Sequence, residues 1–338
     1  MTFPEHAASR ARSARPTIVD VASRAGVSKS LVSLALRGDP GVGAATRERI
    51  VQVAEEIGYR PHVLARALRE RRTRRVGVIL ASLDNPYHTE VAAAVEDAAE
   101  KAQLSVLLAH GKRTSGQMEE RINALLDLNL DGIVVVSSWA PPEMLQAAAR
   151  RAPVVMIGRS TEAVDGIDSV NNDDEAGAAL AVDHLAAAGH SKILHVNSSP
   201  RPAGLARRQG YEAAMRAHGL EAHIRVTSRG PDGALEPDLA AALAEGYDAV
   251  FARNDVEAAD VLDYAWDHDI AVPDELAVVG YDDSMLARRT RPRLTSVHQP
   301  RADMGARAVE LLLERIDGRS EDYHEVHAPR LVVRESAP

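Results

Sequence analysis

The sequence predicts a small all-α head followed by an α/β body that contains two doubly wound parallel-sheet lobes. Two short helical segments joined through a glycine turn lie within the first 60 residues, and a third helical segment follows them. From Val76 onward, short apolar runs alternate with amphipathic helical segments, a pattern typical of parallel sheets covered by helices. Seven or more such units over about 260 residues suit two sheets better than one.

The net charge of −9 is distributed unevenly along the chain. Residues 1–75 contain 15 Lys and Arg against 7 Asp and Glu, a balance of +8, and the remainder has a balance of −17. A basic segment of this kind indicates either a polyanionic partner or a solvated basic tail on an enzyme. Charge alone does not separate these two interpretations.

Composition argues against several classes of protein. The absence of cysteine excludes disulfides, thiolate zinc sites and cysteine nucleophiles. An aromatic content of 3% argues against a single-strand binder that relies on base stacking. No apolar run approaches the roughly 20 residues of a membrane span, and residues 1–15 lack the apolar core of a secretion signal. We therefore expect a soluble, cytoplasmic protein with no membrane partner.

The first helix is expected to begin after Thr17, which can act as its N-cap. Residues 1–15 show no periodicity and are expected to form a disordered arm. The apolar positions of the helix recur at helical spacing and are Ile18, Val21, Ala22 and Ala25. Gly26 then permits the positive φ that ends the helix.

Two more helices complete the expected head. Ser28 is the predicted N-cap of a second helix that stops at residues 37–38. A third helix is expected over about 44–57 and closes with Gly58. Together the three helices are expected to enclose one small apolar core.

The body is expected to alternate strands and helices, after a linker that ends near residue 75. The predicted strands are Val76–Ala81, Ser105–Ala109, Gly132–Val136, Val154–Ile157, Ile193–Val196, Ala249–Ala252 and Leu276–Gly280. The predicted helices are 88–102, 116–128, 174–188, 207–218 and 256–268. No repeat is sharp enough to indicate a duplication.

Several motifs resemble those of the lactose-repressor (LacI/GalR) family of transcriptional regulators. In the head and linker these are residues 17–28 (TIVDVASRAGVS), 46–50 (TRERI), 57–61 (IGYRP) and 65–68 (ARAL). In the body they are Asp183-His-Leu with Gly189-His190, Asn254-Asp255, 279–283 (VGYDD) and 294–299 (LTSVHQ). Their order along the chain makes the resemblance specific, and it covers residues 17 to about 334.

The resemblance implies a division of the chain into five parts, with a body that resembles periplasmic sugar-binding proteins. The parts are a disordered arm (1–15), a helix-turn-helix DNA-binding domain (16–60), a hinge helix and linker (61–75), an N-terminal lobe (76–170 with 300–322) and a C-terminal lobe (171–299 with 323–338). The resemblance also implies a homodimer that binds operator DNA and a small-molecule effector.

The second helix of the head carries the predicted DNA contacts. In a helix-turn-helix, the N-terminal residues of the second helix meet base edges in the major groove. The predicted base contacts are Lys29, Ser30, Ser33 and Leu34. The predicted backbone contacts are Thr17, Ser28, Arg37, Arg47 and Arg60. For Lys29, a phosphate contact or plain exposure to solvent is the alternative.

The hinge carries a predicted minor-groove contact. Leu68 aligns with the leucine that family members insert into the minor groove at the operator centre, where unstacking is offset by the contacts of a bent site. Arg66 is expected to lie beside the same groove, and His62 replaces an asparagine that the family commonly has after the proline. The alternative is that Leu68 only packs the hinge.

The predicted ligand-binding residues follow the strands of the body, where a ligand binds between two doubly wound lobes. The family pattern carries Arg207 over as a ligand clamp and Asp282 as an acceptor for hydroxyl groups, with Asn254 beside them. The first lobe is expected to contribute Asn85, Tyr87, His88, Ser137 and Trp139. Helix capping is the alternative role for Asn85 and Ser137. Arg159 stands where relatives carry an acid, and a contact between Arg159 and the ligand would indicate an acidic ligand.

The expected function is that of a ligand-responsive, nucleoid-associated transcriptional repressor with a sugar or sugar derivative as effector. No phosphate loop, nucleophile elbow or paired zinc histidines appear, so we expect no enzyme activity, metal or cofactor. Two alternatives remain. One is a purine-responsive regulator with a nucleobase corepressor, and the other is an exported sugar-binding transport protein, against which the basic head argues.

Overall fold

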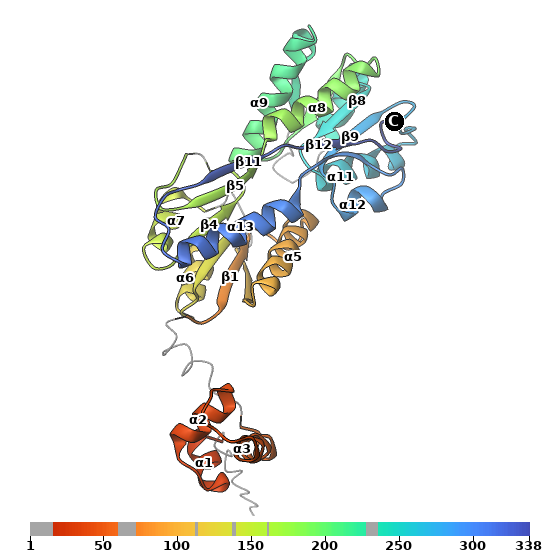
Figure 1. The fold of residues 1–338 in the computed structure, drawn as a ribbon. Coiled ribbons are helices and arrows are strands. Elements are labelled where there is room, and N and C mark those ends of the chain that lie inside the picture. Colours follow the sequence, from red (N-terminus) through yellow and green to blue (C-terminus); the bar gives the residue numbers. More distant parts are fainter. Residues whose placement is uncertain (1–15, 60–71, 112–113, 137–139, 161, 228–235) are drawn as a thin grey trace, which may run out of the picture. The chain divides into compact units, whose positions relative to one another are not determined.

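The computed structural model describes residues 16–59, 72–111, 114–136, 140–160, 162–227 and 236–338. It divides the chain into two units, residues 1–73 and 74–338, and each unit has its own core. The first unit is the helical head, and the second is the α/β body (Figure 1). Within the described part of the chain, no helix is both long enough and apolar enough to cross a membrane.

The head consists of α1 (Ile18–Ala25), α2 (Lys29–Arg37) and α3 (Ala44–Glu56), as predicted. The hydroxyl of Ser28 accepts a hydrogen bond from the Leu31 amide at 3.2 Å, which confirms Ser28 as the N-cap of α2. Gly26 has a φ of 66°, so a glycine is favoured where the chain leaves α1 for the turn. The core of the head is formed by Val21, Ala22, Ala25, Val32, Ala35, Ile50 and Ala54.

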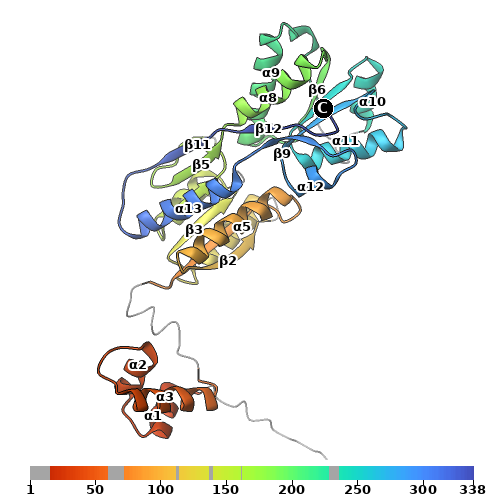
Figure 2. The same ribbon diagram turned by 45° about the vertical axis from the view of Figure 1, so that its right-hand side comes forward.

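The first lobe of the body is a six-stranded parallel sheet with helices on both faces. Its strands, in sheet order, are β11 (His324–His327), β5 (Asp168–Asn172), β4 (Val154–Ile157), β3 (Gly132–Val136), β1 (Arg75–Leu80) and β2 (Ser105–His110). One face packs against α5 (Pro86–Lys101) and α13 (Arg301–Ile316), which lie side by side in Figures 1 and 2. The other face packs against α6 (Ser115–Leu126) and α7 (Pro142–Ala149).

The second lobe repeats this three-layer arrangement. Its strands, in sheet order, are β12 (Arg330–Val332), β10 (Thr295–His298), β9 (Ala277–Asp282), β8 (Ala249–Ala252), β6 (Ile193–Val196) and β7 (Arg225–Thr227), with only β12 antiparallel. One face is covered by α8 (Asp174–Ala187) and α9 (Pro202–Ala217). The other is covered by α10 (Glu236–Ala244), α11 (Asp255–Asp267) and α12 (Met285–Arg289), and a short 3₁₀ helix (Glu221–His223) precedes β7. Two doubly wound lobes therefore make up the body, as expected.

The chain passes between the lobes three times, and two passages differ from the expected boundaries. β5 continues to Asn172, beyond the boundary expected after residue 170. β11 pairs with β5 in the first sheet, so the last passage lies between β11 and β12 and not after residue 322. β11 has the sequence HEVH and lies at the sheet edge, half exposed, so it has no apolar run that would identify it as a strand of either lobe.

A buried carboxylate fixes the returning segment to the first sheet. Asp168 of β5 is fully buried and accepts two hydrogen bonds from Arg315, both at 2.8 Å. Arg319 Nη2 lies 2.6 Å from the same carboxylate, and the Tyr323 amide donates to it at 2.8 Å. Burial by itself raises the pKa of Asp168, but the hydrogen bonds from Arg315 and Arg319 outweigh it and hold the pKa below the usual value. The negative charge of Asp168 therefore orders the end of α13 and the entry to β11.

We predict that Asp168→Asn lowers the free energy of unfolding of the body by about 3 kcal/mol, because it removes the buried carboxylate that Arg315 and Arg319 share and leaves them with the more exposed carboxylates of Asp322 and Glu314. Urea denaturation followed by circular dichroism at neutral pH measures this loss. The matched control is Asp127→Asn, which removes an exposed ion pair with Arg151 (2.6 Å) and is expected to cost less than about 1 kcal/mol. Equal losses in the two variants would contradict the prediction.

The same carboxylate predicts a pH dependence. Because the pKa of Asp168 is lower in the folded body than its usual 3.8, its contribution is complete above that value and disappears as the pH falls through the folded-state pKa. The stability difference between the parent protein and Asp168→Asn is thus expected to shrink in strong acid. Denaturation midpoints of both proteins from pH 7 down to pH 3 test this.

Candidate functional site

The predicted base-contact residues lie on the surface of α2. Lys29 and Ser30 are exposed at the start of the helix, and Ser33 and Leu34 are partly exposed one turn later. Val32 and Ala35 face the core of the head, so the helix has a buried side and an outer side that carries these four residues. An outer side of this kind is free to enter a major groove.

Three of the predicted backbone contacts also make internal contacts in the head. Thr17 and Ser28 are exposed N-caps of α1 and α2, and Thr17 forms a capping box with Asp20. Arg47 donates a hydrogen bond to the carbonyl of Asp39, which fixes the segment between α2 and α3. The remaining predicted contacts of the head and hinge lie outside the described side chains or residues; they are Arg37, Arg60, His62, Arg66 and Leu68.

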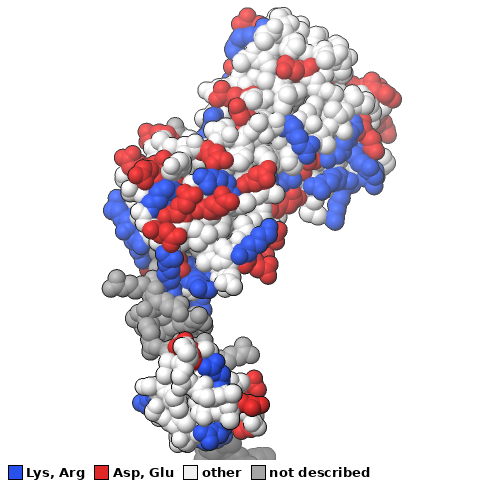
Figure 3. Space-filling model, in the orientation of Figure 1, with Lys and Arg blue, Asp and Glu red and all other residues white. Residues whose placement is uncertain are grey.

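The positive charge of the N-terminal region lies outside the three helices. Residues 16–59 contain five basic and five acidic residues, whereas residues 60–75 contain seven basic residues and one acidic residue. Figure 3 shows acidic side chains over both lobes of the body, interspersed with basic ones. The net positive charge of the N-terminal region therefore lies mainly in residues 60–75, whereas the three-helix segment is balanced.

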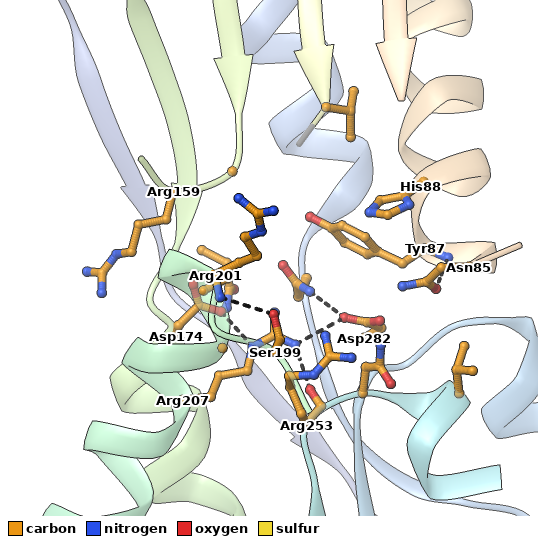
Figure 4. Close-up of a pocket in the computed structure, with 18 of the residues that line it drawn as sticks. Asn85, Tyr87, His88, Arg159, Asp174, Ser199, Arg201, Arg207, Arg253 and Asp282 are labelled. Atoms are coloured by element: carbon orange, nitrogen blue, oxygen red, sulfur yellow. Dashed lines mark hydrogen bonds and ion pairs between the residues drawn. The ribbon is translucent and has the colours of Figure 1, made fainter. Parts of the chain in front are cut away.

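A cavity of about 310 Å³ lies between the two lobes, near the carboxyl ends of the strands (Figure 4). The structure brings together seven of the nine predicted ligand-binding residues in its wall: Asn85, Tyr87, His88, Arg159, Arg207, Asn254 and Asp282. Ser137 and Trp139 lie outside the described residues. The predicted residues of the two lobes therefore share one pocket.

Arg207 is held at the floor of this pocket by contacts on all sides. Its side chain is 8% exposed, and its Nε donates to Asp174 Oδ1 at 2.8 Å. Nη1 donates to the carbonyl of Arg253 at 2.7 Å and lies 3.7 Å from Asp282 Oδ1. The guanidinium carbon lies 3.6 Å from the ring centroid of Tyr281, a cation–π contact. The orientation of the Arg207 guanidinium in the wall of the pocket is therefore fixed by the protein.

Asp282 ends β9 in an unusual backbone conformation. Asp282 and Asp283 have φ values of 104° and 47°, both in the left-handed region that non-glycine residues rarely adopt. Gln299 Nε2 donates to Asp282 Oδ1 at 2.6 Å, and Arg301 donates to the carbonyls of both aspartates. Burial raises the pKa of Asp282, and Arg207 opposes this rise. The strain is consistent with a carboxylate that is positioned for a function.

Asn254 lines the pocket as expected, and it also caps a helix. Its Oδ1 accepts a hydrogen bond from the Glu257 amide at 2.9 Å, so Asn254 is the N-cap of α11 as well as a pocket residue. The carboxylate of the next residue, Asp255, accepts hydrogen bonds from Ser284 and Ser296 behind the pocket. Burial and the nearby charge of Asp282 raise the pKa of Asp255 to about 7.

The first lobe contributes an aromatic wall. Asn85 caps α5 through the Tyr87 amide at 3.0 Å, so the capping role considered for it is the one observed, although its side chain also lines the pocket. His88 Nδ1 lies 3.1 Å from the carbonyl of Ser82, and the rings of Tyr87 and His88 are edge to face at 5.7 Å. Burial raises the pKa of Tyr87, so its phenol stays neutral and can donate a hydrogen bond.

Arg159 lies at the margin of the pocket. Its Nη1 is 3.1 Å from Glu175 Oε1, and Figure 4 shows the side chain directed away from Tyr87 and Asp282. The pair joins the first lobe to α8 of the second lobe. The geometry gives Arg159 a charge partner within the protein and so does not require an acidic ligand.

The sequence analysis did not identify several pocket residues as ligand-binding; these are Asn172, Asp174, Arg201, Arg253, Glu257 and Gln299. Gln299 is the last residue of the 294–299 motif, and its place in that motif could have identified it as a pocket residue. Glu257 lies 3% exposed on α11, where its Oε1 accepts hydrogen bonds from Arg253 (2.8 Å) and Ser198. Nothing local in the sequence distinguishes it from a solvent-exposed helix residue.

Comparison with known protein families agrees with both units. Residues 17–62 match the model of bacterial regulatory proteins of the lacI family, and residues 182–337 match a periplasmic binding protein-like domain. Among solved structures, the Lac repressor dimer bound to operator superposes with a TM-score of 0.83 at 23% identity, over 96% of this chain and 99% of that one. That likeness is one of fold.

Relatives of higher identity span nearly the whole chain. Catabolite control protein A of Priestia megaterium is 31% identical, over 95% of this chain and 98% of its own length. The transcriptional regulator GalR of Escherichia coli (strain K12) is also 31% identical, with 95% of each chain covered. The regulator CelR, solved in complex with cellobiose, is 31% identical with a TM-score of 0.69, over 95% of this chain and all of that chain. The chain belongs to the LacI/GalR family of bacterial transcriptional regulators.

Proposed function

We propose that this protein is a repressor whose operator affinity is set by an uncharged, polyhydroxylated ligand bound between the lobes of its body. The observation that carries the proposal is the buried cluster of Arg207, Asp174 and Asp282 in a cavity between the lobes. Charged groups of this kind bind sugar hydroxyls through strong, directional hydrogen bonds. Two copies of α2, related by a two-fold axis, would read the two halves of a pseudo-palindromic operator.

The charge balance of the pocket favours a neutral ligand over an acidic one. Its described lining contains four arginines (Arg159, Arg201, Arg207, Arg253) and four carboxylates (Asp84, Asp174, Glu257, Asp282). A ligand with a net charge would add a buried charge without a partner, which is costly. The presence of cellobiose in the CelR structure supports the same class of ligand. A neutral ligand is therefore favoured over the acidic ligand that the position of Arg159 suggests.

A purine-responsive regulator is the less favoured alternative. Regulators named PurR are found among the relatives, at 30% identity in Vibrio vulnificus. However, Tyr87 and His88 are the aromatic rings among the described lining residues, and most of the remaining wall is charged or polar. A nucleobase needs flat surfaces on which to stack, and a sugar uses the hydrogen-bonding groups that this pocket offers.

Contacts between the lobes provide a route by which the ligand can act on the hinge. Glu90 of α5 accepts a hydrogen bond from the Met285 amide of the second lobe at 2.7 Å. Its other oxygen lies 3.0 Å from Arg301, which in turn holds the backbone of Asp282. A ligand that binds one arrangement of the lobes more tightly shifts the population toward it. We infer that this shift is passed on to residues 62–69 and so to the operator.

We predict that Arg207→Lys and Asp282→Asn each abolish the response to ligand and leave operator affinity unchanged. Lys cannot reproduce the planar fork of Arg207, and Asn removes the acceptor charge of Asp282. Fluorescence anisotropy with operator DNA, with and without ligand, measures both quantities. The matched control is Arg208→Lys, because Arg208 is the exposed neighbour of Arg207 and forms an ion pair with Glu212 on its own helix. A normal response in either pocket variant would contradict the assignment.

A panel of related ligands tests the predicted class. The panel contains neutral mono- and disaccharides, the matching sugar acids and sugar phosphates, and purines. Isothermal titration calorimetry should detect binding of the neutral sugars and of none of the other compounds. We expect an acidic analogue of the best neutral sugar to bind at least about tenfold more weakly, since an unpaired buried charge costs well over 1.4 kcal/mol. If the acid or a purine binds more tightly than the neutral sugar, the proposed class of ligand is wrong.

A third prediction concerns the operator contact of Lys29. If Lys29 contacts a base, Lys29→Ala loses about 1–3 kcal/mol of discrimination at one operator position and leaves non-specific binding in place. If Lys29 only contacts phosphate, binding weakens equally at all sequences and the dependence on salt falls. The control is Arg24→Ala, which removes the same charge from the exposed end of α1. Binding to single-base operator variants at two salt concentrations separates these outcomes.

A further inference from the structure

A second cavity, of about 590 Å³, lies beside the interlobe pocket. Its wall is built from α7, the segment that follows β4, strand β5, the start of α9 and the edge strand β11. The apolar part of its lining includes Leu145, Met156, Val164 and Ile167 of the first lobe and Leu205 of the second. Both lobes therefore contribute to this second cavity.

The first turns of α9 separate the two cavities. Arg201, Gly204 and Arg207 line the interlobe pocket, whereas Pro202, Leu205, Ala206 and Gln209 line the second cavity. The latter four residues follow the i, i+3, i+4, i+7 spacing of one helix face. One short helical segment thus presents a polar face to one cavity and a mainly apolar face to the other.

The floor of the second cavity is apolar and partly open to solvent. Val164 and Ile167 are buried beneath it, and Leu205 at its wall is 45% exposed. Val326, which lies opposite Asn171 in the β5–β11 pairing, is 59% exposed on the same side of the sheet. Exposed apolar side chains grouped around a concave surface are typical of a binding site.

A short hydrogen-bonded chain runs along one side of this floor. Asn171 Nδ2 donates to Ser169 Oγ at 3.3 Å, and Ser169 Oγ lies 2.9 Å from His324 Nδ1. Ser169 Oγ accepts from Asn171 and keeps its own hydrogen for a second partner; when it donates that hydrogen to Nδ1, the His324 ring carries its proton on Nε2. Within the described part of the chain, Nε2 of His324 has no hydrogen-bond partner. In this tautomer Nε2 is an exposed donor at the edge of an apolar surface.

We propose that this second cavity is a separate binding site for an uncharged amphipathic molecule that has an apolar body and an acceptor oxygen. The apolar body would lie on Leu205, Val164 and Ile167, and the oxygen would accept a hydrogen bond from His324. Of the charged residues of the lining, Arg159 is paired with Glu175 and Glu162 is exposed to solvent, so the site does not favour an ion. The proposal concerns a different cavity from the sugar pocket and does not depend on the proposed function.

The position of α9 has a consequence for regulation. A molecule bound against Leu205 and a ligand bound against Arg207 contact opposite faces of the same two helical turns. Each is therefore expected to change the affinity of the other, and by the same factor in both directions.

The absence of native cysteine allows a direct test of the site in the full-length protein. A single cysteine is introduced by Leu205→Cys, and in the control protein by Leu128→Cys, at a leucine that is 50% exposed and away from the cavity. Each protein is equilibrated with an aryl methyl ether disulfide or with bis(2-hydroxyethyl) disulfide over a series of free thiol concentrations. Intact-mass spectrometry gives the fraction captured, and thermal unfolding confirms that both variants fold.

The expected result is an equilibrium constant for capture of the aryl ether about tenfold above that of the hydroxyethyl group at position 205, with little preference at position 128. An equal preference for the aryl ether at positions 205 and 128 would overturn the proposal. The second cavity would then be a cleft that only allows the lobes to move. Adding His324→Phe to the Leu205→Cys protein is expected to remove the advantage of the aryl ether over a phenylethyl disulfide. If that advantage persists, His324 is not the donor.

Capture needs neither operator nor sugar, so a failure here is distinguishable from a failure of the proposed function. The Leu205→Cys protein with the aryl ether attached is then titrated with the best neutral sugar. A changed sugar affinity supports coupling through α9. An unchanged affinity shows that the two cavities act independently.

Discussion

The body of this protein depends on the burial of one arginine between two aspartates. Arg207 of α9 must be matched by Asp174 at the start of α8 and by Asp282 at the end of β9, because an unpaired guanidinium in this position would be strongly destabilising. Buried ion pairs add little net stability compared with apolar residues of similar volume. The cluster therefore adds little to the stability of the fold, and the proposed role in ligand binding gives it a function.

This constraint extends outward from the pocket. Asp282 reaches Arg207 because its backbone and that of Asp283 adopt left-handed conformations, and Arg301 holds both carbonyls. Arg301 lies at the start of α13 and also pairs with Glu90 of α5. Asp282 is thus one contact away from α13 and two contacts away from α5, the two helices that pack on one face of the first sheet. Hydrogen bonds and ion pairs therefore connect the wall of the pocket in the second lobe to helices of the first lobe.

The sequence identified the elements with strong local patterns and not those with weak ones. The three helices of the head were predicted to within a residue or two because caps such as Ser28 and glycines such as Gly26 mark their ends. α9, in contrast, begins at Pro202 and not near residue 207, and β5, with the sequence DSVNN, was missed. A polar strand between covered neighbours has no apolar run, so its burial comes from Arg315, Arg319 and the sheet around it.

The sequence by itself determined the family, the two lobes and most of the residues that meet in the pocket, because motifs of fixed order carry that information. The tertiary structure determined which other side chains these pocket residues contact. Glu257 and Asp174 enter the pocket because their helices begin at the carboxyl ends of strands, and Arg159 turns to Glu175 and away from the cavity centre. Tertiary structure also created the second cavity, whose lining comes from five segments that are separated in the chain and meet only when both lobes have folded. Such long-range pairings leave no local pattern in a single sequence.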